Sequence, residues 1–203
     1  MTAEEYYGEL LPVLKQGEQQ LIHLIHGYPA ENDSDGIQSI IYIKSRIKSP
    51  DSMIQKLRKK GLEATDSRTA LENTNDAIGI RVVCSFCEEV YKLKEWLCER
   101  SEIQVIKIKD YMAYPKPNGY RSIHLIVQFQ DEMGKQQNAE IQIRTIAIDF
   151  WAVLEHQMKY KKHVAHEEII RNELKRCADE IASLDVSMQT IREILGSDEW
   201  GEE

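Results

Sequence analysis

The sequence has no long apolar run, no export signal and few cysteines. Its longest apolar stretches span only a few residues, which is too short to cross a bilayer. The start, Met1–Glu5, has neither the basic residues nor the apolar stretch of an export signal, so we expect a cytoplasmic protein without a membrane partner. Cys84, Cys87, Cys98 and Cys177 are too scattered for a disulfide framework. The C-x-x-C of Cys84 and Cys87 lacks a second pair at zinc spacing, which favours a structural role.

Internal repeats, low-complexity tracts and Gly/Ser- or Pro-rich linkers are also missing from the 203 residues. The composition, 42% hydrophobic and 30% charged, is typical of a globular protein. We therefore expect a single domain over residues 1–203, with a core at about 37–161 and helical extensions at 1–28 and 165–196.

The net charge of −8 argues against a non-specific nucleic-acid-binding protein, because binding to the phosphate backbone requires clustered lysine and arginine. One basic cluster nevertheless stands out. Taken alone, such a run is most often a solvated face. The cluster comprises Lys44, Arg46 and Lys48, followed by Lys56, Arg58, Lys59 and Lys60.

Hydrophobic spacing predicts the helices and strands. Apolar residues at helical spacing over 1–28 predict an N-terminal helix, in which Pro12 implies a kink or a late start. Ser49, followed by Pro50, is typical of a helix start. Further helices are expected at about 88–98, from Thr145 to about 160, and at about 167–195. Strands are expected at 37–47, 77–84, 102–109, 122–129 and 137–144.

The order of these elements predicts an α+β fold. We expect a mixed, mostly antiparallel five-stranded sheet flanked by helices, with long N- and C-terminal helices. A turn at 131–134 would join the last two strands as a hairpin. In the C-terminal helix, apolar residues from Ile170 to Leu195 recur in steps of four and three, a seam that suits packing against another long helix.

Two carboxylates are candidates for chemistry. Alternation in the last strand buries Ile141 and Ile143 and places Glu140 on the other face, together with Gln142 and Arg144. Asp76 comes just before the apolar run 78–84. Magnesium prefers hard oxygen ligands that phosphates and water complete, so two such acids could hold it. The same pattern on Glu140 would also suit a plain solvent face.

The segment Tyr111–His124 adds a tight loop with prolines and Asn118-Gly119, which presents cations and aromatic rings beside a strand. Aromatic faces stack on bases and cations bind phosphates. The string Tyr-Pro-Lys-Pro-Asn-Gly-Tyr-Arg-Ser-Ile-His, with Asn-Asp-Ala-Ile-Gly-Ile-Arg before it and Glu-Ile-Gln-Ile-Arg-Thr after it, resembles the synthetase domain of the RelA/SpoT family. The similarity runs from about Lys44 to Tyr160. The length leaves no room for a His-Asp hydrolase domain, so the chain resembles a small, synthetase-only alarmone synthetase.

This resemblance implies a nucleotidyltransferase-like synthetase fold and a Mg²⁺-dependent GTP diphosphokinase of the stringent response. The enzyme would transfer pyrophosphate from ATP to the ribose 3′-hydroxyl of GDP or GTP and release AMP. Two alternatives stay open: an inactive nucleotide- or RNA-binding regulator of the same fold, and a nucleotidyltransferase that releases pyrophosphate. The resemblance also implies a homotetramer, and it leaves open (p)ppGpp or single-stranded RNA as an allosteric ligand.

Residue roles carry over from the family motifs. Asp76 and Glu140 resemble the catalytic and metal-binding acids, and Glu140 could be a base, a metal ligand or both. Asp149 is a candidate guanine reader or an acid favoured by the helix dipole. Residues that resemble ATP contacts are Arg46, Lys48, Lys56, Arg58, Lys59 and Arg81. Residues that resemble GDP or GTP contacts are Lys109, Lys116, Tyr120, His124, Gln142, Arg144 and Asp149.

One conflict arises within this assignment. In a regular strand Asp76 and Arg81 would point to opposite faces, yet the resemblance puts both in one active site. Either Asp76 lies in the loop before the strand, or a bulge intervenes.

Overall fold

A computed structural model describes the chain apart from residues 33–37, 64–65, 132–133, 160–166 and 198–203. Its five strands form one sheet with the order β1-β2-β5-β4-β3. Among these strands, β2 and β5 pair in parallel and the other neighbours pair antiparallel, which confirms a mixed, mostly antiparallel sheet. The strands are β1 (Ile40–Ile47), β2 (Ile78–Cys84), β3 (Gln104–Asp110), β4 (Ile123–Gln130) and β5 (Gln136–Thr145).

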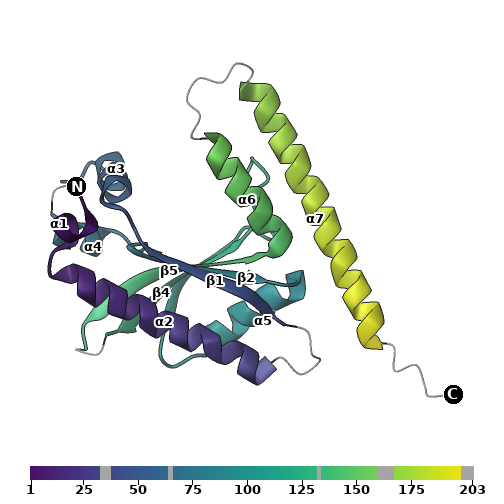
Figure 1. Ribbon diagram of the computed structural model, residues 1–203, viewed down its shortest axis with the longest axis horizontal. Helices are drawn as coiled ribbons and strands as arrows, with labels where there is room; N and C mark the ends of the chain where they lie inside the picture. Colours follow the sequence, from purple (N-terminus) through teal and green to yellow (C-terminus); the bar gives the residue numbers. More distant parts are fainter. Residues whose placement is uncertain (33–37, 64–65, 132–133, 160–166, 198–203) are drawn as a thin grey trace.

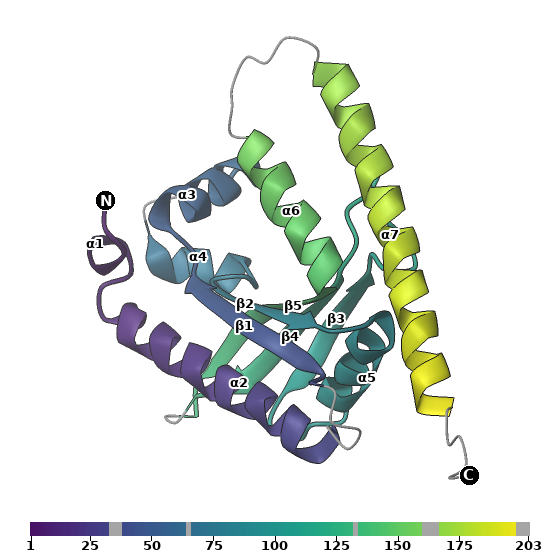
Figure 2. The same ribbon diagram turned by 45° about the vertical axis from the view of Figure 1, so that its right-hand side comes forward.

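The helices flank this sheet. In Figures 1 and 2, α2 and α5 cover one face, while α6 and α7 stand on the other side. Short helices α3 and α4 lie near one end of β1 (Figure 1). The helices are α1 (Ala3–Tyr7), α2 (Leu10–Asn32), α3 (Pro50–Lys59), α4 (Ser67–Asn73), α5 (Cys87–Cys98), α6 (Ile146–Lys159) and α7 (Glu167–Ser197).

The main core lies between the sheet and the pair α2 and α5. Ile80, Leu125 and Ile141 from three adjacent strands are fully buried there, against Ile25 of α2 and Leu93 of α5. Each such side chain contributes about 1.5–3 kcal/mol by leaving water. Because inward and outward residues alternate along β5, burial of the isoleucines turns its polar side chains to the opposite face.

Several local predictions are confirmed. Ser49 caps α3 by accepting a hydrogen bond from the backbone of Ser52, and Pro50 takes the first helical position. Thr145 caps α6, since its hydroxyl accepts from the backbone of Ile148. β4 and β5 form the expected hairpin, although residues 132–133 of its turn lie outside the described part of the chain, as does Tyr160.

Two helical details differ from expectation. The N-terminal helix divides at Gly8, whose φ of 52° favours glycine. Pro12 fits the expected late start, because it sits in the first turn of α2, where its missing N–H costs nothing. Helix α4 was not predicted, because its seven residues carry little periodicity. A capping aspartate, Asp66, was its one local signal; its carboxylate accepts from the backbone of Arg68 and Thr69.

Helix α7 contacts the rest of the protein from Leu174 to Arg192. Trp151 of α6 donates from Nε1 to the carbonyl of Leu174 at 2.8 Å, and Thr145 donates to Asp185 at 2.7 Å. On the apolar seam itself, however, Leu184 and Leu195 are 53% and 65% exposed. The predicted seam is therefore covered by α6 over part of its length and bare over the rest. No helix in the described ranges is long and apolar enough to span a membrane.

Candidate active site

A cavity of about 230 Å³ lies over β1, β2 and β5. It is smaller than a usual ligand pocket of about 300–1,000 Å³, so a nucleotide bound there would project beyond it. Three cations and two acids meet around it although the whole chain is acidic. Lys44, Arg46 and Arg81 line it together with Asp76, Glu140 and Gln142.

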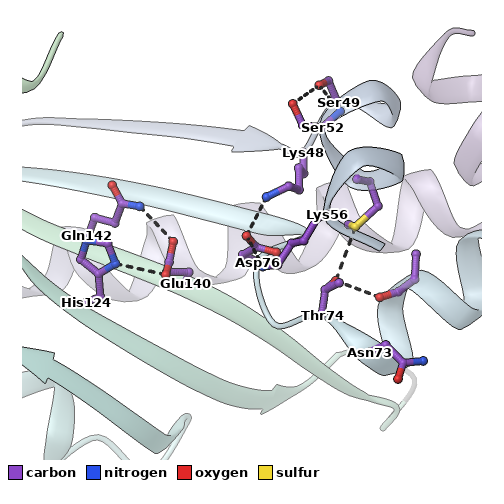
Figure 3. Close-up of polar contacts among 12 residues, drawn as sticks. Lys48, Ser49, Ser52, Lys56, Asn73, Thr74, Asp76, His124, Glu140 and Gln142 are labelled. Carbon is purple, nitrogen blue, oxygen red and sulfur yellow. Dashed lines mark hydrogen bonds and ion pairs between the residues drawn. The ribbon is translucent and has the colours of Figure 1, made fainter. Parts of the chain in front are cut away.

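Asp76 lies in the loop directly before β2, which resolves the conflict over its direction in favour of the loop alternative. Lys48 and Lys56 each place Nζ 2.7 Å from Asp76 Oδ2 (Figure 3). Burial raises the pKa of the Asp76 carboxyl, but hydrogen bonds and charge from the two lysines outweigh it, so this pKa is lowered overall. Asp76 Oδ1 is buried and has no hydrogen-bond partner among the described residues.

The loop that carries Asp76 is anchored at both ends. Thr74 donates to the carbonyl of Ala70 at 2.8 Å and lies 3.6 Å from the sulfur of Met53 (Figure 3). The backbone of Lys48 donates to the carbonyl of Ala77 at 2.8 Å. These bonds fix Asp76 beside the end of β1, where Lys48 can reach it.

Glu140 sits on β5, on the face opposite the core. His124 Nδ1 lies 3.1 Å from Glu140 Oε1, and Gln142 Nε2 donates to Oε2 at 2.9 Å (Figure 3). Burial opposes ionisation of Glu140, yet the hydrogen bond and charge of His124, with smaller contributions from Gln142 and Lys109, lower its pKa to about 2. Glu140 is therefore a carboxylate throughout the physiological range.

A hydrogen-bonded chain continues from Glu140 to the aromatic loop. Tyr120 Oη lies 2.8 Å from His124 Nε2, and Arg144 donates to the same phenol oxygen at 2.7 Å. The imidazole of His124 thus joins the Tyr120 phenol through Nε2 to the Glu140 carboxylate through Nδ1. The ammonium of Lys116 stands over the ring of Tyr120, 4.7 Å from its centroid.

Asp149 lies behind these groups in the first turn of α6 and is 2% exposed. Its carboxylate contacts Arg81, Arg144 and Tyr42, and it does not line the cavity. The predicted guanine-reading role of Asp149 stays a prediction. In this arrangement both of its oxygens are already occupied by protein groups.

The structure brings together most of the site residues that the sequence predicts. Lys109 on β3 is opposite His124 on β4 in the sheet register, within reach of the same region. Arg58 and Lys59, by contrast, lie exposed in the last turn of α3 and do not line the cavity.

Sequence reasoning assigned no role to Tyr42 and Tyr111. Tyr42 shares a face of β1 with Lys44 and Arg46, two and four residues on, so strand alternation could have found it. The ring of Tyr111 packs edge-on against His124, with centroids 5.2 Å apart. Its position in the aromatic loop was the available signal.

Asp76 and Glu140 are the residues of the cavity that could hold a metal. The described residues hold no group of three or more histidine, cysteine or acidic side chains that could bind a metal. Cys84 is buried in β2 and Cys87 starts α5, and both thiols are free. Asp76 and Glu140 line one cavity, and Asp76 Oδ1 has no partner among the described residues. Two carboxylates suit Mg²⁺, which takes one or two protein acids and completes its shell with phosphate and water.

Comparison with known proteins identifies the family. The family model for the region found in RelA / SpoT proteins matches residues 45–165, so the chain belongs to the RelA/SpoT family. Over 176 residues it is 39% identical to the GTP pyrophosphokinase YwaC of Bacillus subtilis, covering 85% of this chain and 79% of that protein. It is 34% identical over 168 residues to YjbM, a GTP pyrophosphokinase of the same organism, covering 81% and 76% of the two chains.

Solved structures agree with the fold. Small alarmone synthetase 1 from Bacillus subtilis, bound to its product pppGpp, superposes with a TM-score of 0.82 at 31% identity, covering 94% of this chain and 97% of that one. Small alarmone synthetase 2 from the same organism gives a TM-score of 0.82 at 36% identity, with 93% and 99% covered. The chain therefore has the α+β fold of the small, synthetase-only members.

Proposed function

We infer that this chain is a (p)ppGpp synthetase, which transfers pyrophosphate from ATP to the ribose 3′-hydroxyl of GDP or GTP and releases AMP. The chain is more than 30% identical to two GTP pyrophosphokinases, and it covers more than three quarters of the length of each. The main structural support for this activity is one cavity, which is lined by Asp76 and Glu140 together with Arg46 and Arg81.

On the donor side, Arg46 and Arg81 would hold the adenine of ATP between planar guanidinium groups. Lys48 and Lys56 would bind the ATP phosphates, and Arg58 and Lys59 would add charge from the exposed end of α3. Both lysines now contact one oxygen of Asp76. Arriving phosphates would attract these ammonium groups and release that oxygen.

A divalent cation, Mg²⁺ in our proposal, would be held by Asp76 and Glu140. It would supply charge neutralisation on the phosphate oxygens. The lowered pKa of both acids supports this role, because each is ionised and ready to ligate at neutral pH. For Glu140 a pKa of about 2 makes proton abstraction inefficient, since a general base works best with a pKa near the working pH. The arrangement thus favours Glu140 as a ligand and hydrogen-bond acceptor rather than a strong base.

On the acceptor side, Tyr120 would stack on guanine. Lys109, Lys116 and His124 would contact the GDP or GTP phosphates. The position of the Lys116 ammonium over the Tyr120 ring supports a shared base and phosphate site. Gln142 and Arg144 would hold this group in place through the hydrogen bonds described above.

In the reaction, the acceptor 3′-oxygen attacks the β-phosphorus of ATP in line. The bond between that phosphorus and the oxygen bridging to the α-phosphate breaks, AMP leaves, and the hydroxyl proton passes to solvent. Lys48 and Lys56 would neutralise charge that develops on the donor phosphates. Both carboxylates remain ionised throughout.

The direct test incubates the purified protein with ATP, MgCl₂ and either GDP or GTP. We expect AMP together with guanosine tetraphosphate or pentaphosphate, respectively. Formation of pyrophosphate instead of AMP would indicate a nucleotidyltransferase. Binding of both nucleotides without turnover would indicate an inactive regulator, in which the two acids would have no evident use.

We further propose a homotetramer. Four residues at successive helical steps, Ile146, Phe150, Leu154 and Met158, form an exposed apolar stripe on α6, and Phe150 is 62% exposed. Bare apolar positions of α7, such as Leu184, extend the available surface. Light scattering of the wild type and Leu184→Asp would test this, and a monomeric wild type at micromolar concentration would contradict it. A cytoplasmic location stays a prediction, and the family resemblance leaves allosteric control by (p)ppGpp or single-stranded RNA open.

A further inference from the structure

One buried carboxylate connects both halves of the site. Asp149 Oδ1 accepts from Arg144 Nη1 at 3.2 Å and lies 3.1 Å from Arg81 Nη1. Asp149 Oδ2 accepts from Tyr42 Oη at 2.5 Å. These partners come from β5, β2 and β1, so a single side chain at the start of α6 ties together three neighbouring strands.

The charges explain why an acid is needed at this point. Arg81 and Arg144 lie on adjacent parallel strands, and Arg144 is almost fully buried. Burial lowers the pKa of Arg81, the charge of Arg144 lowers it further, and Asp149 opposes both effects. Without the carboxylate, two guanidinium groups of the same sign would face each other with little water to screen them.

Each arginine serves a different substrate. Arg81 lines the cavity assigned to ATP. Arg144 donates to the Tyr120 phenol at 2.7 Å and to Gln142 Oε1 at 2.8 Å, and both residues belong to the acceptor group. Asp149 itself does not line the cavity, and both of its oxygens already accept from protein groups.

We propose that Asp149 is a positioning residue, anchored by Tyr42, that sets Arg81 for the donor nucleotide and Arg144 with Tyr120 for the acceptor, rather than a residue that reads guanine. The proposal rests on the function inferred above. It assigns the role of Asp149, which the sequence left undecided, and it gives a role to Tyr42.

The two roles predict different kinetics. Asp149→Asn keeps the size of the side chain but removes its charge, so both arginines lose a charge-assisted hydrogen bond. Such bonds contribute about 1.5–3 kcal/mol, and we expect KM to rise about tenfold or more for ATP and for GDP alike. Tyr42→Phe removes one anchoring bond and should raise both constants in the same direction by about two- to tenfold.

An acceptor analogue separates positioning from base reading. Inosine diphosphate lacks the 2-amino group that a guanine-reading carboxylate would bind. We expect the wild-type ratio of kcat/KM for GDP over inosine diphosphate to be unchanged in Asp149→Asn. A collapse of that ratio, with the KM for ATP unaltered, would establish the reader and overturn the proposal. Unchanged constants for both substrates would overturn it as well.

A control variant tests whether removing the charge of any acid in the first turn of a helix changes the KM values. Glu88 lies in the first turn of α5, pairs with Lys92 at 2.9 Å and lies away from the cavity. Glu88→Gln should leave both KM values as in the wild type. Circular dichroism melts of all variants report folding. If Asp149→Asn and Tyr42→Phe lower the Tm but show wild-type KM values where folded, the contacts are merely structural and the proposal fails.

Binding measurements keep this test separate from the proposed reaction. If the wild type produces no AMP, the synthetase assignment fails, but titration calorimetry with ATP and with GDP still measures each affinity. Weaker binding of both nucleotides to Asp149→Asn and Tyr42→Phe would support the positioning role even then. A wild type that binds neither nucleotide, or an Asp149→Asn variant that loses GDP binding alone, would overturn it.

Discussion

Replacing Asp76 by asparagine is the sharpest test of the site, because it changes one charge and almost no volume. In the wild type, the carboxylate contacts the ammonium groups of Lys48 and Lys56 at 2.7 Å each, and its side chain is 17% exposed. Exposed ion pairs contribute about 0.2–1 kcal/mol, whereas breaking a buried pair costs about 3–5 kcal/mol. Since these pairs are partly exposed, we expect a loss of about 2 kcal/mol in the free energy of unfolding.

That loss is too small to unfold the protein. Domains are stable by about 5–15 kcal/mol, so even the lower bound leaves about 3 kcal/mol, which keeps more than 99% of the molecules folded. Turnover should fall much further, because removing one preorganised electrostatic group costs about a hundred- to a thousandfold in kcat. Loss of a metal ligand adds to this effect. The variant should therefore be folded and almost inactive.

The assay compares urea unfolding with the rate of AMP formation from ATP and GDP in MgCl₂. Glu72→Gln provides a control, since Glu72 is an exposed acid on α4 close by in the sequence. It should retain the wild-type rate. Turnover of Asp76→Asn within tenfold of the wild type would refute the assignment of Asp76, and an unfolded variant would refute the stability reasoning.

Three further changes follow from the site and its supports. Tyr120→Ala should raise the KM for GDP about fivefold or more, because base stacking is worth about 1–3 kcal/mol, and a rise confined to ATP would contradict this. Glu140 has a pKa of about 2 in the folded protein against an ordinary 4.5, so its ionised form stabilises the fold fully above pH 4.5, and this stabilisation is lost as the pH falls toward 2. In urea titrations, the free energy of unfolding of the wild type should therefore drop about 2 kcal/mol more than that of Glu140→Gln between pH 5.5 and pH 3. Gly119→Ala should lower the Tm, because Gly119 has φ +87° and an added methyl would lie 2.5 Å from Ala178 Cβ. An unchanged Tm would contradict this and would show that α7 can shift to make room for the methyl group.

The sheet could be predicted because its signals are local. The apolar run Ile78–Cys84 and the alternation around Ile141 predict two strands whichever strands they pair with. Thr145 marks a helix start because its own hydroxyl caps the helix. The aromatic loop was visible in the same way, because cations and aromatic rings gather in it, whereas the pattern around Glu140 also suited a plain solvent face. Asp76 could be assigned to the same site as Glu140 only through the family resemblance.

Long-range geometry could not be predicted from these signals. Parallel pairing of β2 with β5 sets Arg81 opposite Gln142, and nothing within either strand specifies that partner. The bond between Thr145 and Asp185 likewise joins residues 40 apart in sequence. Helix α4 escaped prediction for another reason: seven residues make too few turns to show a helical period.

The hydrogen-bonded chain from Glu140 to Asp149 bears on how the two substrates communicate. Glu140, His124, Tyr120, Arg144 and Asp149 are joined by successive contacts of 3.1, 2.8, 2.7 and 3.2 Å. A nucleotide phosphate that draws His124 away from Glu140 would free Glu140 Oε1 from this contact, while the Tyr120 phenol would keep its hydrogen bond from Arg144. Binding of the acceptor nucleotide should therefore free a Glu140 oxygen to contact the cation and the 3′-hydroxyl. Such coupling predicts that GDP tightens Mn²⁺ binding in the wild type, and that His124→Ala abolishes this effect without abolishing Mn²⁺ binding itself.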